Sequence, residues 1–193
     1  MDINTQRLVL RQPRIDDLAD LFRIYGDPAT NVYNPLGPFA DLAYTQTTLE
    51  TWLTQWQRES FGMWAISHQH QPNHILGFGG LSHRLFAGQH IINLGYRFAV
   101  EAWGNGFATE AARTMLIAGF EHFELNIISA TARIHHKASQ HVLQKVGFHY
   151  CQTIYDLPDT PPACLYQLTS LDWQYQTNQK RTRLEPFAIM IES

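Results

Sequence analysis

Apolar side chains recur along the chain with two different spacings, and these spacings predict alternating strands and helices. From position 108 to position 123 they recur at steps of three and four, which is typical of one apolar helix face. Positions 127–134 are almost all apolar or small, as in a strand that is covered on both faces. We expect strands at 7–11, 62–67, 75–81, 91–100, 127–134, 148–155 and 163–173, and helices near 16–25, 42–58, 108–125 and 137–145.

Composition narrows the class of protein. A chain of 193 residues with 45% hydrophobic residues suits one globular domain with a sizeable core. The net charge of −3 gives no reason to expect a nucleic-acid partner, which usually meets a basic face. The apolar stretches are too short to span a membrane, and the first residues lack the basic start and apolar core of a signal peptide. We therefore expect a cytoplasmic protein.

Cysteine and histidine, the residues that most often hold metals or form cross-links, follow no functional spacing here. Cys151 and Cys164 fall in neighbouring predicted strands, and in a reducing cytosol we expect two buried thiols without a disulfide. His135 and His136 are adjacent in sequence and so point to different faces of any regular element. None of the ten histidines occurs in an H-E-x-x-H or comparable spacing, so we expect no metal site.

The run W-G-N-G-F-A-T-E-A at 103–111 joins a predicted strand to a predicted helix. Glycine lets the backbone adopt positive φ and lets a ligand approach closely. The first turn of a helix has N–H groups without partners and a partial positive charge. Gly104 and Gly106 therefore predict an anion site that suits phosphates, although a tight packing turn would also explain two glycines.

Two further runs make the interpretation more specific, namely A-S-Q-H-V-L-Q-K-V-G-F at 138–148 and T-Q-R-L-V-L-R at 5–11. Together with the glycine run, they resemble the GNAT superfamily of acetyltransferases, and most closely its RimJ/RimL-type branch, which acetylates protein N-terminal alanines. The resemblance extends from about Thr5 to Trp173. It implies the α/β fold of that family, a mixed sheet of about seven strands flanked by four helices, which matches the predicted order of elements.

The resemblance also implies an acetyl-CoA site. The backbone of Phe98, Ala99 and Val100 would pair with the pantetheine arm like an added strand, where two neighbouring strands separate. The backbone amides of the glycine run would hold the pyrophosphate: Gly104, Asn105, Gly106, Phe107, Ala108 and Thr109. We expect the side chain of Phe107 to serve packing, and Glu110 to serve the start of the helix. Ser139 would bond the pantetheine or protonate the departing sulfur, or else cap the short helix.

Several positions depart from the family pattern. His136 stands where the family has asparagine, and a neutral imidazole can supply one of the hydrogen bonds of that residue, so we keep His136 in the cofactor site. Glu101 stands where relatives carry Gln or Arg, and we expect it to point away from the pyrophosphate. Asn93 replaces a common acidic residue, and Leu143 replaces the general-acid tyrosine of another branch. The proton for the sulfur must then come from Ser139, from water or from another tyrosine, and we can name no general base.

These features predict an enzyme that transfers an acetyl group from acetyl-CoA to a primary amine by direct attack in a ternary complex. The acceptor is a protein N-terminus or a small amine. The weak signal for a general base favours an α-amine as the acceptor. With a pKa of about 8, roughly a tenth of the α-amine molecules are neutral at pH 7, whereas less than about a thousandth of lysine side chains are.

A non-catalytic sensor of CoA is the alternative, which the departures at Asn93 and His136 leave open. A simple nucleotide site fits poorly, because the chain lacks a G-x-x-x-x-G-K-[ST] motif. We expect residues 1–173 to form one acetyltransferase domain, as a monomer or homodimer. Residues 174–193, polar and basic at first and then apolar, form an extension that would pack on the domain, cover the acceptor site or join a dimer.

Overall fold

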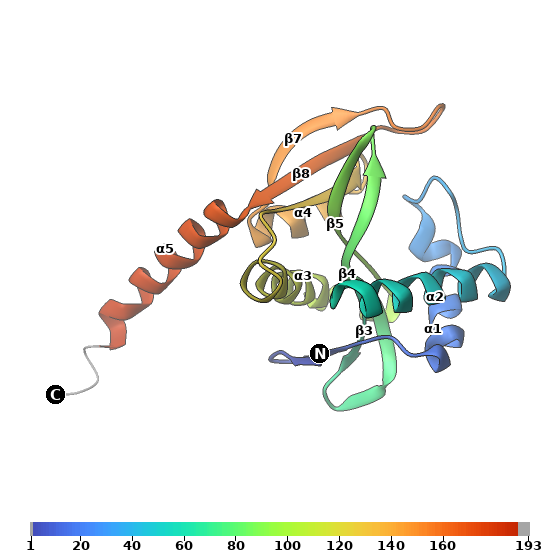
Figure 1. Cartoon of the computed structure of the whole chain (residues 1–193), viewed down its shortest axis with the longest axis horizontal. Helices are drawn as coiled ribbons and strands as arrows, with labels where there is room; N and C mark the ends of the chain where they lie inside the picture. Colours follow the sequence, from blue (N-terminus) through green and yellow to red (C-terminus); the bar gives the residue numbers. More distant parts are fainter. Residues whose placement is uncertain (1, 189–193) are drawn as a thin grey trace.

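The computed structural model describes residues 2–188, with side chains up to residue 179, as a mixed sheet with helices on both faces (Figure 1). Within these residues, eight strands lie in the order β1-β2-β3-β4-β5-β6-β8-β7. The strands are β1 (Ile3–Asn4), β2 (Leu8–Arg11), β3 (Met63–His68), β4 (Gln71–Phe86), β5 (Gln89–Phe98), β6 (Ile127–Arg133), β7 (His149–Ile154) and β8 (Ala163–Thr169). The helices are α1 (Leu18–Tyr25), α2 (Leu42–Glu59), α3 (Phe107–Ile117), α4 (Lys137–Val146) and α5 (Ser170–Ala188).

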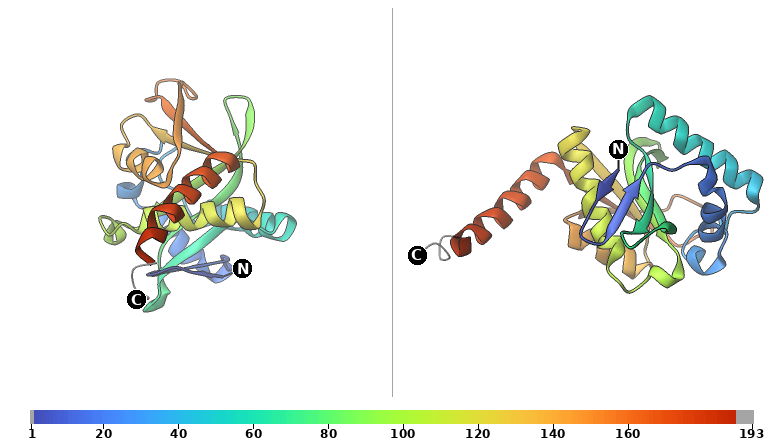
Figure 2. Two further views of the ribbon diagram at one scale, coloured as in Figure 1. Left: turned by 90° about the vertical axis from the view of Figure 1, so that its left-hand side faces the viewer. Right: turned by 90° about the horizontal axis from the view of Figure 1, so that it is seen from below.

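Two pairs of helices cover opposite faces of the sheet, as the view from below shows (Figure 2). On one face, Leu21 of α1 and Leu49 of α2 join Phe78 of β4 in one buried cluster. On the other face, Met115 of α3 and Leu143 of α4 belong to the larger cluster. Because successive strand residues point to opposite faces, each central strand contributes to both layers of the core.

The contact between β5 and β6 differs from every other contact in the described sheet. It is parallel and consists of a single residue pair, Asn93 with Ser129, whereas all the other neighbouring strands pair antiparallel. After this pair, Leu94–Phe98 stays bonded to β4 but has no partner on β6. The two halves of the sheet therefore separate along the last residues of β5, as the resemblance led us to expect.

The structure confirms the mixed α/β fold but has eight strands and five helices in its described part, where we predicted seven and four. The short β1 was missed, and β4 and β5 continue through 82–90 to a turn at Ala87 and Gly88, which both have positive φ. We did not predict this extension because polar residues such as His83 and Arg84 interrupt the apolar pattern there.

The last predicted strand, 163–173, is wrong in its second half. The strand ends at Thr169, and α5 begins at Ser170 and projects away from the sheet (Figures 1 and 2). The Thr169 hydroxyl accepts a hydrogen bond from the Asp172 N–H (3.1 Å) and donates to its carboxylate (2.6 Å). This T-x-x-D spacing is a helix-start signal that we overlooked. The expected extension, 174–193, thus begins inside α5, and its residues 189–193 lie outside the described part.

The two cysteines lie on the paired strands β7 and β8, as predicted, and both are free thiols. Cys164 is buried, but Cys151 is exposed, so the prediction that both are buried is wrong for Cys151. The reason is local: the register between β7 and β8 shifts between Tyr150 and Gln152, and Cys151 lies in that irregularity.

Candidate acetyl-CoA site

The glycine run forms a loop whose backbone N–H groups are left without partners. A short helical turn at Val100–Ala102 follows β5, Gly104 and Gly106 both have φ of +76°, and α3 starts at Phe107. The first helical bond runs from the Glu110 N–H to the Gly106 carbonyl (3.2 Å). None of the six N–H groups from 104 to 109 donates to any described group of the protein. Six consecutive free donors at a helix start are the expected donor set of an anion site.

Side chains around the loop hold its backbone in place. The Asn105 side-chain amide donates to the carbonyls of Trp103 (3.0 Å) and Ala102 (3.3 Å). The Trp103 indole donates to the Phe98 carbonyl (3.0 Å), which ties the loop to the end of β5. The Phe107 ring lies beneath the Arg7 guanidinium at 4.8 Å, so its side chain serves packing, as predicted. The loop is therefore rigidly supported while its N–H groups remain available.

Glu110, in the first turn of α3, is bonded to the first residues of the sheet. Its carboxylate accepts hydrogen bonds from the Thr5 hydroxyl (2.5 Å), the Arg7 backbone N–H (2.9 Å) and the Arg7 guanidinium (2.7 Å). Arg7 also donates to the Asn105 carbonyl (2.8 Å). Burial raises the pKa of Glu110, but the hydrogen bonds from Thr5 and Arg7 outweigh this and leave the pKa below its usual value. Glu110 therefore ties the first turn of α3 to the start of the sheet, and its expected role at the helix dipole stays a prediction.

The free edge of β5 presents further backbone groups. Ala99 donates to the Leu76 carbonyl (2.8 Å), and hydrogen-bonded positions alternate along an antiparallel pair. The peptide groups of Tyr96 and Phe98 therefore point away from β4, into the gap where β6 has separated. The Ala99 carbonyl accepts from Ala102, so both backbone groups of Ala99 are already used within the protein. The N–H of Val100 donates to no described group, whereas its carbonyl accepts from Trp103 (3.1 Å).

Tyr96 and Ser139 meet across this gap. The Tyr96 hydroxyl lies 3.2 Å from the Ser139 hydroxyl, which lies in the first turn of α4. No capping hydrogen bond from a side chain forms at this helix start, so the structure does not support a cap role for Ser139. Burial raises the pKa of Tyr96 to about 12, although the bond to Ser139 acts in the opposite direction. Sequence reasoning missed Tyr96, because only the fold brings these distant residues together.

His136 precedes α4 and stacks on the Tyr33 ring, with 4.3 Å between the ring centroids. Burial lowers the pKa of His136, and the positive charge of Arg97 lowers it further, so the imidazole is neutral at pH 7. Glu101 pairs instead with Arg23 (3.1 Å), 3.6 Å from His74.

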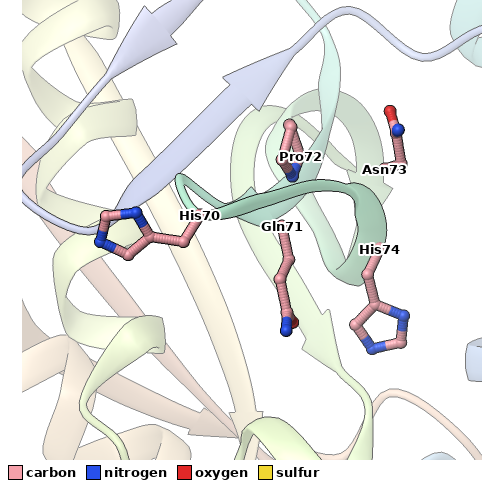
Figure 3. A pocket seen from close by; sticks show the side chains of 5 residues that line it. All are labelled: His70, Gln71, Pro72, Asn73 and His74. Atoms are coloured by element: carbon pink, nitrogen blue, oxygen red, sulfur yellow. The ribbon is translucent and has the colours of Figure 1, made fainter.

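A shallow depression elsewhere on the surface is lined by one hairpin turn, His70–His74, with its two histidines at opposite ends (Figure 3). It includes no residue of the glycine loop or of the free β5 edge. Within the described residues, no group of three or more His, Cys, Asp or Glu side chains is placed to hold a metal ion. No helix in this part of the chain is long and apolar enough to cross a membrane.

Comparisons with known proteins agree with this geometry. Residues 7–149 match the family described as "Acetyltransferase (GNAT) domain". The uncharacterized protein YkkB of Bacillus subtilis is 33% identical over 155 residues, covering 78% of this chain and 86% of YkkB. An acetyltransferase (GNAT family) from Bacillus anthracis superposes with a TM-score of 0.73 at 21% identity, covering 88% of this chain and 99% of that one. A RimL ribosomal L7/L12 alpha-N-protein acetyltransferase, solved in complex with coenzyme A, gives a TM-score of 0.70 at 16% identity, covering 88% and 98%.

The Glu110 carboxylate should stabilise the fold in a pH-dependent way. Because its folded-state pKa lies below the usual 4.5, its contribution is present above that pH and is lost as the pH falls through the folded-state pKa. We expect Glu110→Gln to lower the free energy of unfolding by about 1–2 kcal/mol at pH 7, and the difference from wild type to shrink below pH 4.5. Urea denaturation between pH 7 and pH 3 measures this. Glu50→Gln, on the exposed face of α2, is the control, and a difference that stays constant down to pH 3 would contradict the assignment.

Proposed function

The chain belongs to the GNAT acetyltransferase family, in its RimL-like branch, and is an acetyl-CoA-dependent N-acetyltransferase; we propose that its acceptor is an α-amine, which attacks acetyl-CoA directly in a ternary complex. The observation that carries this proposal is the combination of two sets of backbone groups that the sheet and helices do not pair. Six free N–H groups start at Gly104, and the peptide groups of Tyr96 and Phe98 face the gap beside β6.

These two sets fit acetyl-CoA in chemistry and in order along the chain. Phosphates suit the N–H groups at the start of α3, and the amide-bearing pantetheine arm suits the open edge of β5. When bound, acetyl-CoA supplies the thioester carbonyl carbon that the amine attacks. We assign the arm to both backbone groups of Tyr96 and to the N–H groups of Phe98 and Val100. Both backbone groups of Ala99 are already bonded, and the carbonyls of Phe98 and Val100 accept from Trp103. The loop amides from Gly104 to Thr109 hold the pyrophosphate.

The pair of Tyr96 and Ser139 serves the leaving sulfur. With a pKa of about 12, the Tyr96 hydroxyl keeps its proton throughout the neutral range. One hydroxyl of the pair donates to the other, and the free proton of the pair is donated to the sulfur as the carbon–sulfur bond breaks. Of the three proton sources that the sequence left open, Ser139, water and another tyrosine, this proposal uses Ser139 together with Tyr96.

Of the primary amines, an α-amine needs the least help from this site in losing its proton. Roughly a tenth of an amine with a pKa of about 8 is already neutral at pH 7, so water can carry the remaining proton away. His136 is neutral at that pH because burial and Arg97 lower its pKa, so its ring does not repel the approaching amine by charge. The residues around the gap therefore suit an N-terminus or a small α-amine better than a lysine side chain.

Acetyl-CoA titration by calorimetry, followed by thiol release with a panel of α-amines, tests the proposal. Gly104→Val should weaken binding at least about tenfold, because the side chain obstructs the phosphate path and strains a left-handed residue. Gly37→Val is a matched control: Gly37 has φ of +72° and, like Gly104, nothing within 4 Å of an added Cβ. This control introduces the same backbone strain at a position outside the glycine loop.

Each outcome of this experiment decides something different. Equal affinity of both glycine variants would overturn the loop assignment. Tight acetyl-CoA binding with no thiol release on any amine would favour the alternative, a sensor without catalysis. Release with lysine side chains but not with α-amines would overturn the proposed acceptor class.

Tyr96→Phe should lower kcat about 100-fold, because it removes one hydrogen-bond donor from the leaving sulfur. The KM for acetyl-CoA should change by less than about threefold, since the backbone of Tyr96 is unaltered. Steady-state thiol release measures both constants. Tyr150→Phe is the control, because that side chain is exposed on β7 and its hydroxyl bonds, among the described residues, to Thr153 alone. A kcat within threefold of wild type for Tyr96→Phe would remove Tyr96 from the mechanism.

A further inference from the structure

The His136 side chain lies on the side of the β5–β6 gap that faces α1 and α2. In the β4–β5 register, Arg97 lies opposite Phe78, which belongs to the buried cluster of α1 and α2. The Arg97 guanidinium accordingly lies 4.4 Å from the centre of the Tyr25 ring of α1. The charge of Arg97 acts on His136, and Tyr33, from the segment between α1 and α2, stacks on its ring. The imidazole therefore reaches the α1–α2 side, although its backbone lies at the start of α4.

The hydroxyl pair that serves the sulfur lies on the opposite side of the gap. Tyr96 is adjacent to Arg97 on β5, so its side chain points to the other face of the sheet, where it meets Ser139 of α4. The glycine loop starts α3 on that same face. On the proposed function, acetyl-CoA thus approaches from the α3–α4 side, and the amine approaches from the side of His136.

The His136 ring is held in one orientation, yet its two nitrogens are unused. Its plane is tilted by only 16° from that of the Tyr33 ring. The Asn31 side chain accepts hydrogen bonds from Arg97 and from Asn34 (2.9 Å), which holds the segment that carries Tyr33. The ring is half-buried, it does not cap α4, and no described group forms a hydrogen bond with either of its nitrogens. Both nitrogens are therefore available to a group in the gap.

The surroundings keep this imidazole unprotonated at pH 7. Arg97 of β5 and Tyr33 face it, and His135 and Lys137 are its neighbours in sequence. Burial lowers the pKa of His136, the charge of Arg97 lowers it further, and no described carboxylate opposes these two effects. One ring nitrogen therefore has a lone pair that can accept a proton.

We propose that His136 is the general base, which accepts the proton that the amine nitrogen loses as it bonds to the thioester carbon. This inference rests on the proposed function and names the base that the sequence did not reveal. The neutral amine attacks with its lone pair, and its nitrogen, now positively charged, passes a proton to the unprotonated nitrogen of His136. As the carbon–sulfur bond breaks, the pair of Tyr96 and Ser139 protonates the sulfur. The proton on His136 then returns through water to the hydroxyl pair, and the enzyme is restored.

A base of lowered pKa suits this step. An α-ammonium group has a pKa of about 8, so an imidazole with a pKa below 6.5 is too weak a base to deprotonate it favourably. The nitrogen becomes far more acidic once it is bonded to the carbon, and it can then give its proton to such an imidazole. Asparagine, which the resemblance led us to expect at this position, has no nitrogen that can accept a proton in this way.

His136→Asn tests the inference, because it keeps a hydrogen-bonding side chain and removes the base. We expect kcat/KM for α-amines to fall about 100-fold, and the acetyl-CoA affinity in calorimetry to stay within about threefold of wild type. In wild type, kcat/KM calculated for the neutral amine should fall about tenfold per pH unit below the pKa of His136. This acid limb should be absent from His136→Asn. Thiol release between pH 4.5 and pH 8 measures both effects.

Two further variants separate a base from a structural residue. His135→Asn is the matched control, since that adjacent histidine is exposed, and it should keep both the wild-type kcat/KM and the acid limb. Arg97→Gln should move the acid limb to higher pH, because the loss of a positive charge raises the pKa of His136. A purely structural role for His136 would produce no such displacement.

The outcomes distinguish this inference from the proposed function. If His136→Asn keeps kcat/KM within about threefold of wild type, or keeps the acid limb, the inference alone is wrong. An acetyl-CoA affinity weakened more than about threefold in this variant would place His136 in the cofactor site and would also overturn the inference. If wild type releases no thiol with any amine, the proposed function fails, and the inference fails with it.

Discussion

The single pairing of Asn93 with Ser129 is the constraint on which the rest of the site depends. It holds two halves of one sheet together while letting them separate immediately afterwards. Had β6 continued to pair with β5, the peptide groups of Tyr96 and Phe98 would be used within the sheet. Because they are not, the core of the protein contains an open strand edge. A ligand that has amide groups of its own can form hydrogen bonds with an open edge of this kind.

The chain compensates for this separation by bonding the surrounding elements to one another. Glu110 ties α3 to the first strands through Thr5 and Arg7, and Arg7 continues to the carbonyl of Asn105. Trp103 ties the same loop back to the end of β5. These side-chain hydrogen bonds thus fix the loop in place while leaving its own backbone N–H groups unpaired. This preorganisation lowers the entropy that binding would otherwise cost.

The parts of the fold that depend on local periodicity could be predicted from the sequence. The helix after the glycine loop and the apolar strand at 127–134 each show one clear spacing, and the loop itself shows in Gly104 and Gly106. The parts that depend on tertiary contacts could not. Tyr96 bonds Ser139 across 43 positions, and Arg84 bonds Thr131 across 47, with no local pattern to mark either pair. The start of α5 was predictable in principle, because Thr169 and Asp172 have capping spacing.

Alternation along β5 explains how one strand can serve two substrates. Tyr96 and Arg97 are adjacent, yet one reaches α4 and the other lies over Tyr25 of α1. On our proposals, the sulfur is handled on the first side and the acceptor on the second, while the peptide groups between them hold the pantetheine arm. The amine then meets the thioester within the thickness of the sheet, with the leaving group already directed away from it. Orientation of this kind needs no covalent intermediate with the protein, which is consistent with the absence of a Ser-His-Asp or Cys-His signature from the sequence.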